Sequence, residues 1–125
     1  MITIVYANPN PQSFNHSILN NITTVLTENG RDYNVIDLYA DGFNPVLSES
    51  DMEKYMHGTP VDKLTDRYQK MMRTTGSLIF IFPIWWGMMP AIVKGFVDKV
   101  FMKGEMNDTT PEGALLPLLN ISSCS

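Results

Sequence analysis

The sequence predicts an α/β fold in which a doubly wound parallel sheet lies between two layers of helices, giving three layers, α/β/α. Residues 2–7 and 77–82 are short and nearly continuous apolar runs, which is typical of strands covered on both faces. Residues 34–38 are expected to form a second short strand. The segments between them carry apolar residues at helical spacing. Because strands alternate with helices, we expect β-α-β units with right-handed crossovers, and hence a parallel sheet.

The first strand leads through a polar loop into a helix. Residues 2–7 are almost entirely apolar. A helix over Phe14–Glu28 is expected because its apolar side chains share one face: Ile18, Ile22, Val25 and Leu26. Asn29 and Gly30 follow and can supply a left-handed stop.

A long polar stretch, residues 39–60, follows the second strand at 34–38. Asp41-Gly42 and Asn44-Pro45 are turn signals within it. Ser48 and the residues after it are typical of a helix cap, so we expect a short helix over 51–56. A second main helix is expected over residues 61–73, where Val61, Leu64, Tyr68, Met71 and Met72 lie at helical spacing.

A further helix is expected over residues 90–102, after the third strand. Pro90 suits its first position, since a proline there sacrifices no helical hydrogen bond. The buried face is predicted to contain Ile92, Val93, Phe96, Val97 and Val100. Asp98 and Lys99 fall on the opposite face, and we expect both side chains to point into water.

Residues 115–122 are expected to form a fourth strand, with Pro117 keeping its first half outside the hydrogen-bond ladder. A doubly wound sheet usually has five strands. We therefore expect residues 1–125 to be a single domain that lacks the last helix and strand.

Composition excludes several classes of function. The chain has 125 residues, of which 44% are hydrophobic and 18% are charged, as in a globular domain. A net charge of −4 without a Lys/Arg cluster argues against nucleic acid as a partner. The longest apolar run, residues 77–87, is too short to cross a bilayer and contains Pro83, so no membrane insertion is expected.

The few cysteines and histidines argue against a disulfide and against a metal site. Cys124 is the single cysteine, which excludes an internal disulfide and favours a cytoplasmic location. His16 and His57 are the only histidines and show no metal-ligand spacing, so we expect no metal site.

The loop after the first strand has the features of an anion site. It contains Ser13 and Asn15, and the helix that begins at this point offers unpaired backbone N–H groups and the positive end of its dipole. Phosphate suits such a turn. The loop lacks both the P-loop pattern and G-x-G-x-x-G, which disfavours ATP hydrolysis and a Rossmann dinucleotide site.

The loop after the third strand has the features of a ring site. Two adjacent tryptophans, Trp85 and Trp86, precede Gly87. Ligands of doubly wound sheets bind outside the carboxyl ends of the strands, where the strand order reverses, and both loops are expected there. A phosphate site and a flat apolar site at one crevice indicate a nucleotide or flavin cofactor.

Each loop also has a simpler interpretation. Ser13 can be an ordinary helix cap beside prolines that stiffen a turn. Trp85 and Trp86 can be packing residues between surface and core.

Three blocks of sequence together resemble the NAD(P)H:quinone oxidoreductase family of flavodoxin-like flavoproteins. They are residues 7–15, residues 37–45 and residues 82–101, and the last contains Pro83-Ile84-Trp85-Trp86 followed by the run from Pro90 to Phe96. The similarity spans nearly the whole chain. It implies a flavodoxin-like fold and a non-covalently bound flavin, usually FAD with FMN as the alternative, in a homodimer with its active site at the subunit boundary.

The resemblance also implies roles for individual residues. Ser13, Phe14 and Asn15 would hold the cofactor phosphates; Pro83, Ile84, Trp85, Trp86 and Gly87 would surround the isoalloxazine; Ser122 and Ser123 would touch the flavin from the other side. Asn8 stands where the family usually has histidine, which makes one phosphate contact neutral. No catalytic side chain is implied, since the flavin carries the redox chemistry.

The function implied in this way is hydride transfer from NAD(P)H through the flavin to a quinone or similar electron-poor acceptor. A second possibility is a flavin-binding regulatory subunit of a potassium-efflux system. A third, a small electron carrier of the flavodoxin type, is disfavoured because the first loop lacks the hydroxyl- and glycine-rich phosphate grip of such carriers.

Overall fold

The computed structural model describes residues 1–101, 107–109, 115–117 and 123–124. The strands are β1 (Ile2–Tyr6), β2 (Tyr33–Asp37), β3 (Ser77–Ile81), β4 (Asn107–Thr109), β5 (Leu115–Pro117) and β6 (Ser123–Cys124). The helices are α1 (Phe14–Glu28), α2 (Glu49–Met56), α3 (Lys63–Arg73) and α4 (Ala91–Val100). The predicted α1 has the same bounds as the observed helix, and the other helices and the first three strands lie within two residues of their expected bounds.

A four-stranded parallel sheet with the order β2-β1-β3-β6 forms the middle layer. The β1 strand pairs with β2 on one side and β3 on the other, which places Tyr6 beside both Asp37 and Ile81. Because β1 is central, four of its five residues are buried. This explains why its sequence is apolar without alternation.

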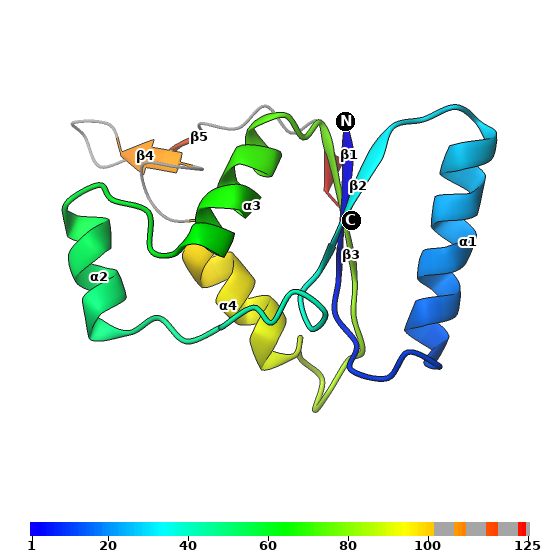
Figure 1. The fold of residues 1–125 in the computed structure, drawn as a ribbon, viewed down its shortest axis with the longest axis horizontal. Helices are drawn as coiled ribbons and strands as arrows, with labels where there is room; N and C mark the ends of the chain where they lie inside the picture. Colours follow the sequence, from blue (N-terminus) through cyan, green and yellow to red (C-terminus); the bar gives the residue numbers. More distant parts are fainter. Residues whose placement is uncertain (102–106, 110–114, 118–122, 125) are drawn as a thin grey trace.

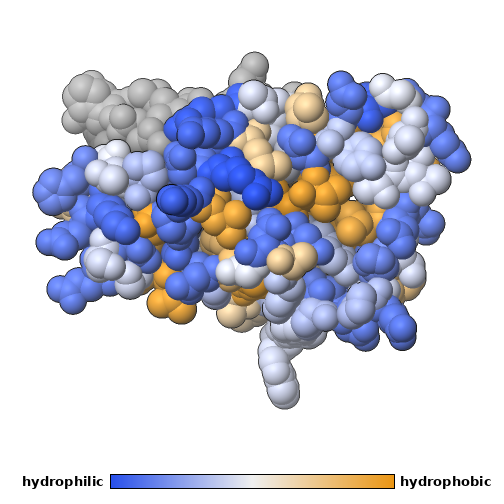
Figure 2. Space-filling model, in the orientation of Figure 1, coloured by the Kyte–Doolittle hydropathy of each residue, from blue (hydrophilic) through white to orange (hydrophobic). Residues whose placement is uncertain are grey.

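Helices cover both faces of this sheet, with α1 on one side and α3 and α4 on the other (Figure 1). Alternate residues of the β1 segment enter two separate cores. Val5 and Ala7 pack in the core shared with α3 and α4, and Ile4 and Tyr6 pack in the core beneath α1. Figure 2 shows apolar atoms in the middle of the molecule between polar outer faces. The predicted three-layer α/β/α architecture is confirmed.

The expected fourth strand differs from the observed one. Leu115–Pro117 (β5) pairs antiparallel with Asn107–Thr109 (β4) in a separate two-stranded sheet, and the fourth strand of the parallel sheet is β6, Ser123–Cys124. Because Pro117 has no N–H to donate, residues 115–117 are poorly suited to the parallel ladder that was expected for residues 115–122. Residues 118–122 of the expected strand lie outside the described residues.

The expectation for Lys99 was wrong, whereas Asp98 is exposed as expected. The Lys99 side chain is only 1% exposed, and its Nζ lies 3.4 Å from Oδ2 of Asp62 and 3.7 Å from Oδ2 of Asp51. It also lies 5.6 Å from the centre of the Phe43 ring. These partners come from α2, from the cap of α3 and from the loop after β2, so one cation joins three segments to α4.

Both carboxylates are also held by helix caps. Asp62 accepts a 2.7 Å hydrogen bond from the Thr65 N–H at the start of α3, and Asp51 accepts one of 3.0 Å from the Ser48 N–H in the capping box of α2. Burial alone would raise the pKa of Asp62, but the Thr65 N–H and Lys99 outweigh it and hold the pKa below its ordinary value. The Ser48 backbone, helped by Lys99, lowers the pKa of Asp51.

Two further contacts hold the polar loop after β2 against the helices. Gly95 lies so close to Pro45 that a Cβ atom on Gly95 would overlap the proline. The Tyr68 hydroxyl donates a 2.6 Å hydrogen bond to Asp41. Burial raises the pKa of Tyr68, and the Asp41 carboxylate raises it further. The loop is therefore fixed next to the carboxyl edge of the sheet.

No helix in the described part of the chain combines the length and hydrophobicity of a membrane span.

The buried position of Lys99 predicts a large loss of stability on its replacement. In Lys99→Met, Asp51 and Asp62 face each other without their cation, and we expect the free energy of unfolding at pH 7 to fall by about 2–4 kcal/mol. The matched control is Lys94→Met in the same helix, which removes only an exposed pair with Asp98 and should change stability by about 0.5 kcal/mol or less. Urea denaturation measures both.

The stability lost in Lys99→Met depends on pH, and the direction follows from the lowered pKa values of Asp51 and Asp62. The lowered carboxylate pKa values stabilise the native state above the unfolded-state pKa of about 4, and this contribution is lost as the pH falls through the lower folded-state values. The difference between the wild type and Lys99→Met should therefore shrink between pH 7 and pH 3. Equal losses in the two lysine variants, or a difference that is independent of pH, would contradict the role assigned to Lys99.

Candidate functional site

The two loops singled out from the sequence leave the same edge of the sheet. The Ala7 N–H donates a 3.0 Å hydrogen bond to the carbonyl of Ile81, just where β1 and β3 end. From this point one chain segment turns to α1 and the other to α4, on opposite faces of the sheet (Figure 1). The expected switch point between β1 and β3 is confirmed, and a crevice between such diverging loops is the usual ligand position in this architecture.

The first loop, residues 8–13, is ordered by its own asparagines. Asn8 Oδ1 accepts from the Asn10 N–H and Asn10 Oδ1 accepts from the Gln12 N–H, each at 2.9 Å. The Ser13 N–H donates to the Asn10 carbonyl at 3.2 Å. Consecutive side-chain turns of this kind fix the backbone that leads to α1.

Ser13 is the N-cap of α1, as the simpler interpretation proposed. Its Oγ accepts a 3.1 Å hydrogen bond from the His16 N–H. A hydroxyl that accepts one hydrogen bond still has its own proton to donate. Capping and ligand binding by Ser13 are therefore compatible.

The start of α1 leaves donors available. Within the described residues, the N–H groups of Phe14 and Asn15 have no hydrogen-bond partner, and the first turn contains no acidic residue. Asn8 Nδ2 donates to Asn15 Oδ1 at 2.9 Å, so Asn8 orients Asn15. The Phe14 side chain is 79% exposed beside these donors. Free amides at the positive end of a helix dipole form an anion site.

The second loop, residues 82–90, forms a tight hairpin. Trp85 and Met88 exchange two backbone hydrogen bonds, of 2.9 and 3.0 Å. Trp86 and Gly87 occupy the turn with φ values of 55° and 73°, the pattern of a type I′ turn. Positive φ is rare for a bulky side chain, and such backbone strain is concentrated at functional sites.

The tryptophans do not pack into the core. Trp86 is 100% exposed, and Ile84, Trp85, Met88 and Met89 are exposed around it. Figure 1 shows the loop between β3 and α4 at the lower end of the molecule, beyond the ends of the strands. Pro83 is partly buried at the base of the loop. Among the described residues, the N–H groups of Ile84, Trp86 and Gly87 have no partner and can serve a polar ligand edge.

Of the two serines expected on the other side of the flavin, only Ser123 belongs to the described residues. Ser122 lies outside the described residues, and Ser123 pairs with Ser77 at the amino end of β3. Four residues of strand separate Ser77 from Ile81, which corresponds to about 13 Å. The register of β6 therefore places Ser123 near the amino ends of the strands, away from the two loops.

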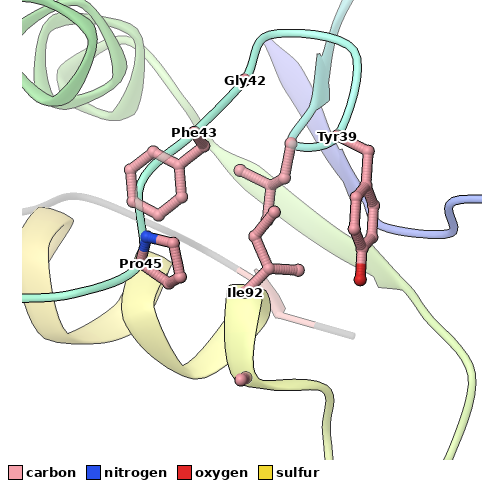
Figure 3. A pocket seen from close by; sticks show the side chains of 7 residues that line it. Tyr39, Gly42, Phe43, Pro45 and Ile92 are labelled. Atoms are coloured by element: carbon pink, nitrogen blue, oxygen red, sulfur yellow. The ribbon is translucent and has the colours of Figure 1, made fainter.

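Two cavities flank the loops. One of about 440 Å³ lies between the loop after β2 and the start of α4. Figure 3 shows the Tyr39 ring on one side of it and Phe43 and Pro45 on the other. The second, of about 330 Å³, lies beside the first loop.

Sequence reasoning missed several residues that line the second cavity, among them Tyr6, Asp37 and Tyr39. The available signal was the acidic residue at the end of the second strand. Within the residues that the structure describes, no group of three or more His, Cys, Asp or Glu side chains could hold a metal ion.

Comparison with known proteins agrees with this geometry. Residues 1–119 match a protein-family model described as a flavodoxin-like fold. A human ribosyldihydronicotinamide dehydrogenase [quinone] is 32% identical over 120 residues, an alignment that covers 82% of this chain and 52% of the relative. The chain thus spans about half the length of the curated relatives it matches.

Two solved structures are similar over most of the chain. The NAD(P)H:quinone oxidoreductase from Methanothermobacter marburgensis has a TM-score of 0.73 at 31% identity, and the alignment covers 81% of this chain and 52% of that protein. The general stress protein 14 from Treponema denticola, in complex with FMN, has a TM-score of 0.60 at 25% identity, with coverages of 86% and 52%. The resemblance stated from the sequence is confirmed.

The strained turn predicts a gain of stability. Trp86→Asn places a residue that tolerates the left-handed region into a type I′ turn, and we expect the free energy of unfolding to rise by about 1 kcal/mol. Gly87→Ala, at the next position of the same turn, should lower it by a similar amount, because a Cβ is disfavoured at that φ. Thermal unfolding of the ligand-free protein measures both. A loss of stability in Trp86→Asn would show that the indole packs against the protein.

Proposed function

Because this chain belongs to the family with the flavodoxin-like fold, we propose that its two loops bind a flavin and that the protein is an NAD(P)H-dependent oxidoreductase acting on a quinone or similar acceptor. The observation that carries the proposal is the placement of two loops with free backbone donors at one edge of the sheet. One loop ends at the start of α1, and the other contains an exposed apolar turn before α4.

The first loop suits the flavin phosphate. The N–H groups of Phe14 and Asn15 point out of the helix start without partners in the described residues, and the Ser13 hydroxyl has a proton to donate. Asn8 contributes through Asn15, whose side chain it holds. The helix dipole supplies the positive potential that no lysine or arginine in this loop provides.

The second loop suits the isoalloxazine ring. Ile84, Trp85 and Trp86 offer apolar surface, and the amides of Trp86 and Gly87 can donate to the polar edge of the ring. A flat ligand of this kind would give the exposed indoles a contact that the isolated chain lacks.

Neither loop contains an ionisable side chain, since residues 8–15 and 82–90 have no Asp, Glu, His, Lys, Arg, Tyr or Cys. The protein therefore binds and orients its ligands here, and it does not move protons through these loops. When bound, the flavin supplies the hydride chemistry between NAD(P)H and the acceptor. The names of the human relative and of the Methanothermobacter marburgensis structure support a nicotinamide donor and a quinone acceptor.

The type of flavin and the assembly state are part of the proposal. FAD was expected from the resemblance, whereas the Treponema denticola structure contains FMN. We propose that the loops bind the FMN group, which both cofactors contain. The exposed Phe14, Ile84, Trp86 and Met88 support a homodimer that covers them. No finding favours the alternative of a regulatory subunit.

The proposal is tested on the intact protein. We expect it to bind FMN or FAD, to lose the visible flavin absorption on anaerobic addition of NADH or NADPH, and to regain it when a quinone is added. A colourless protein that binds neither flavin would contradict the proposal. Reduction by the nicotinamide without reoxidation by any quinone would contradict the acceptor class.

Ser13 provides a residue-level prediction. Ser13→Ala should weaken flavin binding by about 1.5–3 kcal/mol, the value of a hydrogen bond to a charged group, and lower stability by about 1 kcal/mol through the lost cap. Ser48→Ala removes the equivalent cap of α2 and should lower stability alone. Calorimetric flavin titration and thermal unfolding separate the two effects. Equal flavin affinity in both variants would leave Ser13 as a cap only.

A further inference from the structure

The larger of the two cavities, of about 440 Å³, has an almost wholly apolar lining. It lies between the loop after β2 and the start of α4. None of the described residues that line it has a charged side chain, and only Tyr39 among them has a polar side-chain atom. The loops proposed to bind the flavin, residues 8–15 and 82–90, contribute no residue to this lining. The flavin therefore leaves this cavity without a ligand.

The cavity is a slot with fixed walls. Figure 3 shows the Tyr39 ring on one side, and Phe43 and Pro45 on the other, with Ile92 between them. Phe43 is only 5% exposed, since it packs in the core. Pro45 is held against Gly95, where no Cβ atom would fit. The walls on this side are thus in place before any ligand binds, as is usual for small-molecule sites.

The cavity lies at the same edge of the sheet as the candidate flavin site. Ala91 and Ile92, which line it, directly follow the second loop in the chain. Tyr39 lines it from the other side and also lines the cavity beside the first loop. A molecule that reacts next to the second loop can therefore extend into this cavity without entering the core.

The lining suits an uncharged hydrocarbon group. It offers no cation to a phosphate or a carboxylate, and no carboxylate to an amine. Aromatic and aliphatic carbon binds hydrocarbon because apolar surface leaves water. At the helix start, the N–H groups of Ala91 and Ile92 have no partner in the described part of the chain. These donors suit a carbonyl oxygen at the end of the cavity that is next to the second loop.

We propose that this cavity binds the apolar side chain of the acceptor, and that the preferred acceptors are quinones with a hydrocarbon substituent such as a short isoprenoid or alkyl chain. The quinone ring lies toward the second loop with one carbonyl oxygen at the start of α4, and the chain packs between Tyr39 and Phe43. The inference rests on the proposed function. It adds to that function the substituent that distinguishes a preferred acceptor from a bare quinone.

Two quinones with the same ring separate the contribution of the chain from that of the ring. One is a dimethoxy-methyl-benzoquinone without a chain, and the other is its decyl derivative. Both are titrated by calorimetry into the flavin-free protein. Both are also used as acceptors for the flavin-loaded protein, with NADH or NADPH as the donor.

The variants place a large side chain inside or outside the cavity. Ala91→Phe fills the cavity from an exposed position in the first turn of α4, and Ala91→Leu fills it less. Lys94→Phe is the matched control, because it adds the same ring to the same helix at an exposed position that does not line the cavity. Thermal unfolding of each variant verifies that it folds.

We expect the decyl quinone to bind the wild type at least roughly tenfold more tightly than the quinone without a chain, and to have a higher kcat/KM by a similar factor. In Ala91→Phe both ratios should fall to about one, with an intermediate value in Ala91→Leu, since the added side chain takes the space of the hydrocarbon. In Lys94→Phe the ratios should equal those of the wild type. A ratio of two quinones cancels any effect of a variant on the flavin or on the donor.

Equal affinity of the wild type for the two quinones would overturn the inference, and it is the result expected if a second copy of this chain occupies the cavity. A preference that persists in Ala91→Phe, or that is lost equally in Lys94→Phe, would also overturn it. A wild type that binds no flavin, or that reduces neither quinone, would instead contradict the proposed function. The titrations of the flavin-free protein are independent of that outcome and still decide whether the cavity binds the chain.

Discussion

The pairing of β1 with β3 is the constraint on which the rest of the structure depends. Their last ladder contact, from the Ala7 N–H to the Ile81 carbonyl, fixes two loops at a common edge although they are more than seventy residues apart in the sequence. Since α1 and α4 then diverge to opposite faces (Figure 1), the edge opens between them. A parallel sheet creates this opening from backbone geometry alone. The side chains of the loops decide only which molecule fits.

Much of the fold could be predicted because it is encoded locally. Phe14–Glu28 has the observed bounds because Ser13 caps it and Asn29-Gly30 end it, and the central strands are apolar because both of their faces are buried. The buried Lys99 could not be predicted in this way, since the carboxylates that pair with it come from residues 51 and 62. The period of α4 places Lys99 on a polar face, and only the tertiary structure covers that face.

In the candidate site, too, some features could be predicted from the sequence and others depend on the tertiary structure. The positions of both loops followed from the strand order, and the flavin contacts of Asn8, Ser13, Phe14, Asn15 and residues 83–87 stay a prediction that the geometry supports. The left-handed backbone at Trp86 had no signal in the sequence, since type I′ turns ordinarily have asparagine or aspartate there. The Tyr6 hydroxyl, which is buried without a hydrogen-bond partner in the part of the chain that the structure describes, was equally hidden, because a missing partner is a property of the folded neighbourhood.

The turn at Trp86 has a practical consequence. Trp85 and Trp86 are the only tryptophans among the 125 residues, and both lie in one exposed hairpin at the edge where the ligand is expected. Indole emission from this protein therefore originates entirely from that hairpin, without a background from the core. Changes in the intensity or wavelength of tryptophan fluorescence therefore report ligand binding at this hairpin without an added label.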